Sequence, residues 1–244
     1  MDFRHKYYPE VEFGGFTDID GTVAFFGRVN SLLKPEFVVL DVGCGRGALQ
    51  DEMIDYKKEL VILKGKVSKV IGIDVDVRAI ENPFLDEFQL LESANWPIED
   101  SSVDLIVCDF VMEHVEDPDQ FLSEARRVLK NGGYICLRTP NRWGYVGLAA
   151  SLIPNRFHAK VTSAVQDGRK EEDVFPTLYR CNSIRKLRRA LRQRDFHSVV
   201  YGFEAEPCYC AFSGLAFFAG VVFQRFAPKL FRSTLFAFGR LKKR

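Results

Sequence analysis

Residues 37–47, FVVLDVGCGRG, specify the architecture of this chain more strongly than any other segment. The apolar, β-rich run 37–42 predicts a strand, and glycines follow it directly at positions 43, 45 and 47. Glycine permits a tight turn and lets a ligand approach the backbone closely, because a side chain would block both. Such a strand and turn indicate a nucleotide-type cofactor site, although the glycines could also serve the turn alone.

Strands and helices alternate on both sides of this segment. Helical spacing is found at 22–33, 48–63, 118–129 and 182–194. Further strands are predicted at 69–74, 88–91, 103–108, 134–138, 198–203 and 234–241. This alternation is typical of an α/β protein. We expect a Rossmann-like, seven-stranded, mostly parallel sheet with helices on both faces and a C-terminal cap or insertion.

The helix after the fourth strand has the clearest boundaries. Asp117 suits the N-cap, and Pro118 suits the first helical position because its missing N–H costs nothing there. An apolar face runs from Phe121 to Leu129, and the sequence Asn-Gly-Gly at 131–133 is expected to end the helix.

The composition is that of an ordinary globular protein, with 244 residues, 47% hydrophobic and 27% charged. We expect an N-terminal helical and aromatic cap at 1–36, a cofactor-binding core at 37–206, and an apolar insertion with a basic C-terminal segment at 207–244. No basic apolar segment opens the chain, so no secretory signal is expected. The six cysteines lack the paired spacing of a zinc site. They favour reduced thiols in a cytoplasmic protein without a metal.

The net charge of +1 conceals an asymmetry along the chain. Residues 180–244 carry 14 Lys/Arg and 3 Asp/Glu, a local charge of +11, which leaves −10 for residues 1–179. A basic end suggests an anionic partner such as a membrane surface or nucleic acid. For the arginine cluster 185–194, a solvated helix face is the favoured interpretation.

Asp74 closes the second predicted strand, where a carboxylate can accept hydrogen bonds from ribose hydroxyls. It could instead cap the following helix. Gly43, Gly45 and Ala48 also fit the dinucleotide fingerprint, so a nicotinamide-dependent oxidoreductase remains open at this point.

Four blocks between residues 37 and 141 decide between these alternatives. They are VVLDVGCGRG, VIGIDVD, NWPIEDSSVDLIVCDFVMEHVEDPDQFLSEARRVLKNGGY and LRTPN. In order and spacing they closely resemble class I S-adenosylmethionine-dependent methyltransferases, particularly the group related to quinone-biosynthesis methyltransferases. A dinucleotide enzyme has no reason to carry the third block.

The resemblance implies roles for the glycine turn. Asp41 should orient the methionine amino group of S-adenosylmethionine, and the backbone around Gly43, Cys44 and Gly45 should pass beneath the methionine part. Gly47 completes the turn.

It also implies roles for the neighbouring strands. Asp74 should bind the ribose, with Val75 near the adenine. Glu92 stands where family members often carry an aspartate that contacts the adenine amino group, and Ser93 is next to it. Asp109 should line the methionine end of the cofactor.

Methyl transfer needs little acid–base chemistry, because the donor is already activated. A base matters when the acceptor is a hydroxyl or an acidic carbon. His114 follows the fourth strand and is the base candidate, although it could instead fix the loop, and Glu113 is expected to orient that loop. Oxygen is the preferred acceptor atom, with carbon and nitrogen open.

Several further residues are candidates for contacts with the acceptor. Trp143 and Tyr145 could line its pocket or simply pack at the start of a helix. His158 with Arg156 is a second candidate, and residues 171–180 could form a lid.

Residues 207–224 are eighteen consecutive uncharged residues. Helical spacing places Phe212, Leu215, Phe218, Val222 and Phe223 on one side, broadened by Phe217 and Val221. The segment is marginal as a spanning helix, so it could cap the active site, form a homodimer interface or lie at a membrane surface. Cap or dimer is favoured, because helices that are apolar all round are usually buried.

The sequence thus predicts a methyltransferase acting on a small-molecule or lipid-linked acceptor, in the cytoplasm or peripherally at a membrane. A cofactor-binding module without catalysis is the non-enzymatic alternative. Nucleic acid is not the favoured substrate, because residues 109–112, DFVM, lack the motif that stacks an extruded base.

Overall fold

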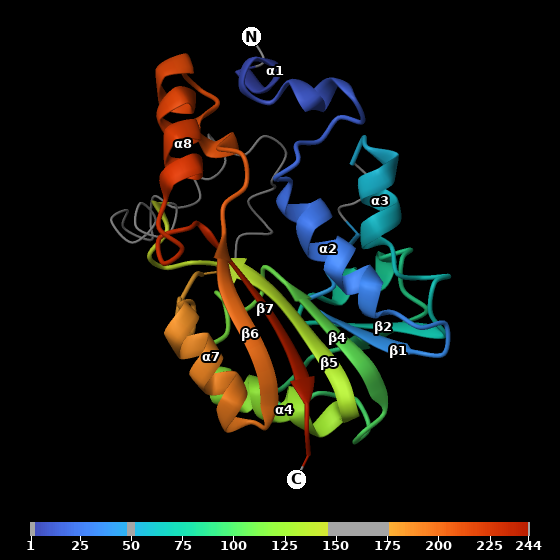
Figure 1. Cartoon of the computed structure of the whole chain (residues 1–244). Coiled ribbons are helices and arrows are strands. Elements are labelled where there is room, and N and C mark those ends of the chain that lie inside the picture. The colour runs from blue at the N-terminus through green and yellow to red at the C-terminus, as the bar shows by residue number, and fades with distance from the viewer. Residues whose placement is uncertain (1–2, 48–51, 146–175, 244) are drawn as a thin grey trace.

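The computed structural model describes residues 3–47, 52–145 and 176–243. Within these residues a seven-stranded sheet has the order β3-β2-β1-β4-β5-β7-β6 (Figure 1). Its strands are β1 (Val38–Val42), β2 (Lys69–Asp74), β3 (Glu87–Leu90), β4 (Val103–Asp109), β5 (Leu129–Pro140), β6 (Phe196–Phe203) and β7 (Thr234–Leu241). All seven predicted strands are confirmed.

The pairing confirms the mostly parallel sheet. β1 pairs in parallel with both β2 and β4, and β4 pairs in parallel with β5. Among these strands, only β7 runs opposite to the others, and it is antiparallel to both of its neighbours, β5 and β6. The strand order reverses between β1 and β4, and open α/β sheets bind ligands at such a point, beyond the carboxyl ends of the strands.

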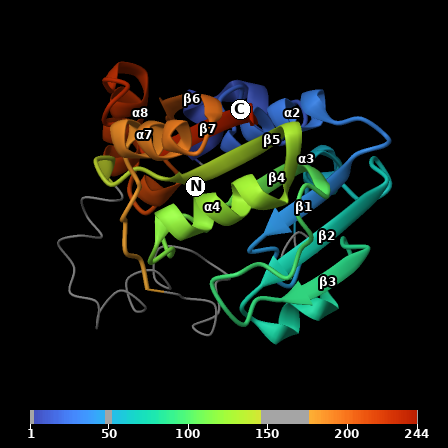
Figure 2. The same ribbon diagram turned by 90° about the horizontal axis from the view of Figure 1, so that it is seen from below.

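Helices cover both faces of the sheet (Figure 2). On one face, α2 (Gly21–Leu32) inserts Phe25, Phe26 and Val29 into the core, with α3 (Asp55–Val61) beside it. On the other face, α4 (Pro118–Val128) and α7 (Ile184–Gln193) pack against the strands. The second half of the expected N-terminal cap is therefore part of the layered core.

The start of α4 is confirmed and its end is corrected. The Asp117 carboxylate accepts hydrogen bonds from two backbone amides of the first turn, and Pro118 follows it. The helix ends at Val128 rather than at the glycines, because buried Leu129 already pairs with Val103 as the first residue of β5. Gly133 allows β5 to approach β4 closely, since a Cβ at this position would lie 2.9 Å from the Asp104 carbonyl oxygen.

The helix predicted at 48–63 is shorter in the structure. α3 begins at Asp55, and the predicted residues 48–51 lie outside the described part of the chain. The Glu52 side chain accepts the amide of Ile54 at 3.0 Å, and this local turn keeps residues 52–54 out of the helix.

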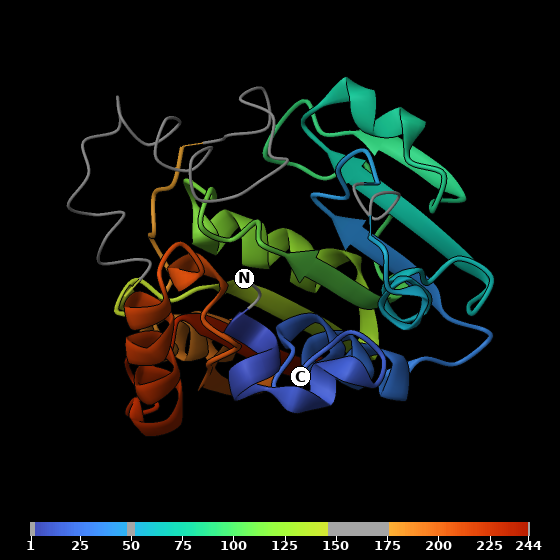
Figure 3. The same ribbon diagram turned by 90° about the horizontal axis from the view of Figure 1, so that it is seen from above.

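The C-terminal insertion is helical and packs on the N-terminus. α8 (Gly214–Phe226) follows a short 3-10 turn, η5 (Cys208–Cys210), and lies beside α1 (Phe3–Tyr7) and the 3-10 turn η1 (Pro9–Glu12) (Figure 3). Among the described residues, no helix combines the length and apolarity needed to cross a membrane.

The buried side of α8 differs from the predicted one. Phe217 and Val221 are buried against Tyr8 and Val11, whereas most of the side expected to be the main apolar surface faces solvent. Gly220 explains which side of α8 is buried. A Cβ at this position would lie 2.5 Å from Pro207, so glycine lets this side of the helix pack closely against the protein.

Candidate active site

Three carboxylates gather at the carboxyl ends of the central strands. Asp41 lies near the end of β1, and Asp74 and Asp109 are the last residues of β2 and β4 on either side of it. The pKa of Asp41 is raised from 3.8 to about 7. Burial contributes most to this rise, and the negative charges of Asp109 and Asp74 contribute the rest. Such a cluster favours a cationic ligand, which would relieve the repulsion.

The glycine turn leaves β1 between these carboxylates. Gly43, Gly45 and Gly47 all have positive φ, at 72°, 53° and 80°, a region that other residues adopt only with strain. A Cβ at Gly43 would lie 2.3 Å from Cγ2 of Val111, whereas a Cβ at Gly45 would meet nothing within 4 Å. The backbone at Gly45 therefore borders open space in which a ligand can approach it.

Asp74 links this turn to the end of β2. Its Oδ2 accepts the amide of Gly45 and its Oδ1 accepts the amide of Asp76, both at 2.9 Å. Each carboxylate oxygen has a second lone pair that can accept a ribose hydroxyl. The alternative role of Asp74 as a helix cap is wrong, because Asp76 caps the following 3-10 turn, η3 (Val77–Glu81).

Asn82 supports the turn and was not singled out from the sequence. Its buried amide nitrogen donates to the carbonyl oxygens of Cys44 at 3.0 Å and Gly45 at 3.1 Å, while its Oδ1 accepts the amide of Phe84. Asn82 follows η3 in a segment of ordinary turn composition, so no local signal distinguishes it.

Replacing Asn82 by aspartate should weaken cofactor binding about tenfold. Asn82→Asp keeps the bond to Phe84, but it replaces the donor with an acceptor facing two carbonyl oxygens, and lost hydrogen bonds of this kind cost about 1–3 kcal/mol. Calorimetric titration with S-adenosylhomocysteine measures the effect. The exposed Asn95→Asp change serves as the control, and equal affinity of the two variants would contradict the role.

The side of the site beyond β2 is apolar and open. Val75, Val77 and Ile80 expose their side chains to solvent, and Glu92 and Ser93 are exposed on the segment after β3. The amide of Leu91 donates to the Asp74 carbonyl oxygen at 2.8 Å, which holds this segment against the end of β2.

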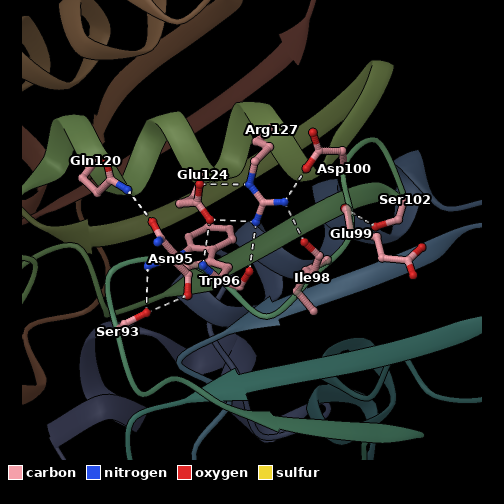
Figure 4. Close-up of polar contacts among 10 residues, drawn as sticks. All are labelled: Ser93, Asn95, Trp96, Ile98, Glu99, Asp100, Ser102, Gln120, Glu124 and Arg127. Atoms are coloured by element: carbon pink, nitrogen blue, oxygen red, sulfur yellow. Dashed lines mark hydrogen bonds and ion pairs between the residues drawn. The ribbon is translucent and has the colours of Figure 1, made fainter.

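A partly buried ion pair anchors the continuation of that segment to α4 (Figure 4). Arg127 pairs with Glu124 at 2.7 Å and donates to the carbonyl oxygens of Trp96 and Ile98, while Glu124 accepts the amide of Trp96. The hydrogen bond from Arg127 lowers the pKa of Glu124, and the amide of Trp96 lowers it further. The loop that begins at Ser93 is thus tied to a core helix.

Asp109 makes a two-pronged ion pair with Arg138 of β5. The Nε and Nη2 atoms of Arg138 each lie 2.6 Å from a carboxylate oxygen of Asp109. The guanidinium lies 5.2 Å from the ring centre of Phe25 and 4.8 Å from that of Phe110. Arg138 belongs to a block that resembles the methyltransferases, but sequence reasoning assigned it no role.

A cavity of about 300 Å³ adjoins this ion pair. Its walls include Thr22, Phe110, Arg138, Phe203, Tyr209 and Phe236. Phe110 has a positive φ of 55°, which is strained for an aromatic residue and is a feature that concentrates at functional sites. The volume suits a small organic molecule, and the walls combine aromatic side chains with the charged groups of Asp20, Lys57, Arg138 and Glu206.

His114 and Glu113 lie in the loop after β4. Nδ1 of His114 lies 2.9 Å from the carbonyl oxygen of Pro176. Because a carbonyl oxygen only accepts, Nδ1 carries the proton of the neutral ring and the basic lone pair is at Nε2. Buried Glu113 accepts the hydroxyl of Thr139 at 2.9 Å, and its carbonyl oxygen accepts two amides, which supports an orienting role.

The other predicted acceptor contacts are not brought to this cavity. Trp143 lies under the guanidinium of Arg142, and the ring of Tyr145 packs 5.4 Å from that of Phe223. His158, Arg156 and half of the expected lid, residues 171–175, lie outside the described residues.

Comparisons with known proteins show which family this chain resembles. Residues 40–137 match the family model of a methyltransferase domain. A Mycolicibacterium smegmatis protein, named a probable S-adenosylmethionine-dependent methyltransferase, is 36% identical over 134 residues, which cover 52% of this chain and 47% of that protein. Residues 40–137 thus carry a methyltransferase domain, and over about half of its length the chain is similar to class I S-adenosylmethionine-dependent methyltransferases.

Two further relatives show the range of this methyltransferase family. The ubiquinone biosynthesis O-methyltransferase of Pasteurella multocida is 30% identical over 130 residues, 47% of this chain and 52% of that protein. The geranyl diphosphate C-methyltransferase of Streptomyces coelicolor A3(2), solved with S-adenosyl-L-homocysteine, shares the fold with a TM-score of 0.55 at 17% identity, over 90% of this chain and 78% of that one. The chain spans about half the length of the two curated relatives.

The site suits the cofactor of the methyltransferases. S-adenosylmethionine carries an ammonium group and a sulfonium, which match the three carboxylates, and a ribose, which matches Asp74. The open space over Gly45 offers room for the methionine part of the cofactor. The exposed side chains of Val75 and Val77 offer an apolar surface for its adenine. The nicotinamide alternative fits less well, because β7 interrupts the strand order typical of dinucleotide-binding sheets.

Proposed function

We propose that this chain transfers the methyl group of S-adenosylmethionine to a small or amphiphilic acceptor in the 300 Å³ cavity. One observation carries the proposal: the Asp109–Arg138 ion pair borders two adjacent sites. Asp109 contributes to the carboxylate cluster around Asp41, and Arg138 lines the cavity. A donor in the cluster and an acceptor in the cavity would therefore meet at the end of β4.

The residues at this meeting point suit transfer to oxygen. S-adenosylmethionine supplies an activated methyl group, so the protein has to align the acceptor, exclude water and receive a proton. Phe110 and Tyr209 form apolar walls of the cavity. His114 is not among the lining residues, but it follows Phe110 by four positions, and its Nε2, 3.9 Å from Oε1 of Glu113, is the base that we assign to the reaction. The name of the O-methyltransferase relative also supports oxygen as the acceptor atom.

Incubating cell extracts with the protein and a cofactor carrying a deuterated methyl group tests the function. We expect mass spectrometry to find a labelled small molecule, and calorimetry to detect binding of S-adenosylhomocysteine. Binding without any labelled product would favour a non-catalytic cofactor-binding module. Absence of both would overturn the proposal.

Replacing His114 by asparagine should lower kcat about 100-fold for an oxygen acceptor, the usual contribution of a general base. The asparagine amide nitrogen occupies the position of Nδ1 and can still donate to the Pro176 carbonyl oxygen, so the loop should keep its conformation. Affinity for S-adenosylhomocysteine should stay at the wild-type value, which distinguishes proton removal from a collapsed site. An unchanged kcat would contradict the role of base.

A further inference from the structure

One side of α8 forms an exposed apolar surface, here called the α8 face and made of Phe212, Leu215, Phe218, Val222 and Phe226. The last four residues are spaced by three, four and four positions, so they lie along one side of the helix. Leu215 is 79% exposed and Phe226 is 78% exposed. A contiguous apolar surface of this kind normally marks an interaction site.

Basic side chains lie beside the α8 face. Arg225 and Lys229 are exposed at the C-terminal end of the helix. The ring of Tyr7 lies 6.2 Å from that of Phe218, and Nζ of Lys6 lies 5.4 Å from the Tyr7 ring centre. Residues 207–244 contain no Asp or Glu, and the carboxylates that share the surroundings of Tyr8 with Arg225 are Glu206, Asp18 and Glu10.

This charge pattern disfavours a second copy of the chain as the occupant. A two-fold contact places the same surface patch on both sides of the interface. Two α8 faces in contact would bring the Arg225 and Lys229 side chains of both copies into one interface, and residues 207–244 supply no carboxylate to pair with them.

We propose that the α8 face lies on an anionic lipid bilayer. Its phenylalanine and leucine side chains enter the boundary between headgroups and acyl chains, and Arg225, Lys229 and Lys6 contact lipid phosphates. A helix with an apolar side and a basic border is the usual form of such interfacial attachment, and it needs no membrane-spanning length.

Docking in this orientation leaves α8 between the bilayer and the cavity. Cys208 and Tyr209 line the cavity and belong to η5, which packs against the Gly220 side of α8 and not against the α8 face. An amphiphilic acceptor from the bilayer therefore has to pass around α8 to reach the cavity. This step alone depends on the proposed methyl transfer; the lipid attachment does not.

Co-sedimentation with vesicles tests the attachment without cofactor or acceptor. We expect the whole chain to bind phosphatidylcholine vesicles containing about 30% phosphatidylglycerol, and to bind pure phosphatidylcholine at least about tenfold more weakly. Leu215→Ser with Phe226→Ser should lower the partition coefficient on the order of a hundredfold, because two large apolar groups no longer leave water. Arg225→Gln with Lys229→Gln should lower it on the order of tenfold on anionic vesicles only.

Val199→Ser is the matched control, since Val199 is an exposed apolar residue of β6 outside the α8 face. It should bind vesicles like the wild type. Circular dichroism should show that all variants keep the wild-type melting temperature, because the changed side chains are exposed. Equal vesicle binding by the wild type and the Leu215→Ser, Phe226→Ser variant would overturn the proposal. So would a wild-type dimer in light scattering that this variant disrupts, with no vesicle binding.

Discussion

Replacing Gly43 by alanine should abolish detectable cofactor binding. Alanine at a φ of 72° is strained, and its Cβ would lie 2.3 Å from Cγ2 of Val111, a branched side chain with little freedom to move. Strain and overpacking together should lower the free energy of unfolding by about 2–4 kcal/mol. Calorimetry with S-adenosylhomocysteine and denaturant unfolding measure the two effects.

Three comparison variants separate the causes of this effect. Gly45→Ala introduces strain at a φ of 53° but no collision, so it should destabilise the protein less than Gly43→Ala does. Gly43→Ala with Val111→Ala removes the collision and should recover part of the stability. Gly27→Ala in α2 meets nothing within 4 Å and should stabilise the fold by about 0.5–1 kcal/mol. Normal cofactor affinity in Gly43→Ala would mean that the turn does not hold the cofactor.

Replacing Asp41 by asparagine should weaken cofactor binding on the order of a thousandfold at pH 8, because removing one member of a buried charge pair leaves the other uncompensated. The change preserves the shape of the side chain. Its effect should therefore be electrostatic, with the ammonium and sulfonium groups of the ligand losing the nearest carboxylate. Calorimetric titration at fixed salt measures it, with the exposed Asp55→Asn as the control.

The pKa of Asp41 gives this prediction a pH dependence. With a pKa of about 7 in the unliganded protein, the carboxyl group is protonated below pH 7 and cannot pair with a cation. Wild-type affinity for the cofactor should fall about tenfold per pH unit below 7 and level off above it. The affinity of Asp41→Asn for the cofactor should not change with pH over this range.

Stability should change in the opposite direction. Because folding raises the pKa of Asp41 from 3.8, the native state holds a proton that the unfolded chain has released. This contribution to stability is full below about pH 4 and is lost as the pH rises through 7. Asp41→Asn should thus raise the melting temperature at pH 8 in the absence of ligand. A lower melting temperature together with normal binding would contradict both parts of the prediction.

The sequence by itself determined the features that depend on neighbours within a few residues. The glycine turn after β1 and the Asp117 cap of α4 follow from local backbone preferences, which act without the rest of the protein. The meeting of Asp41 and Asp74 at one edge also followed, since the carboxyl ends of neighbouring parallel strands coincide.

Only the tertiary structure decided which distant side chains complete the site. Asn82 holds carbonyl oxygens 37 and 38 residues away, and Arg138 holds Asp109 29 residues away. α8 shows the same limit, because a helix that is apolar nearly all round does not indicate which side is buried. Tyr8 and Val11, some 200 positions earlier in the chain, cover Phe217 and leave the α8 face in solvent, since burial depends on the surface that folding brings alongside.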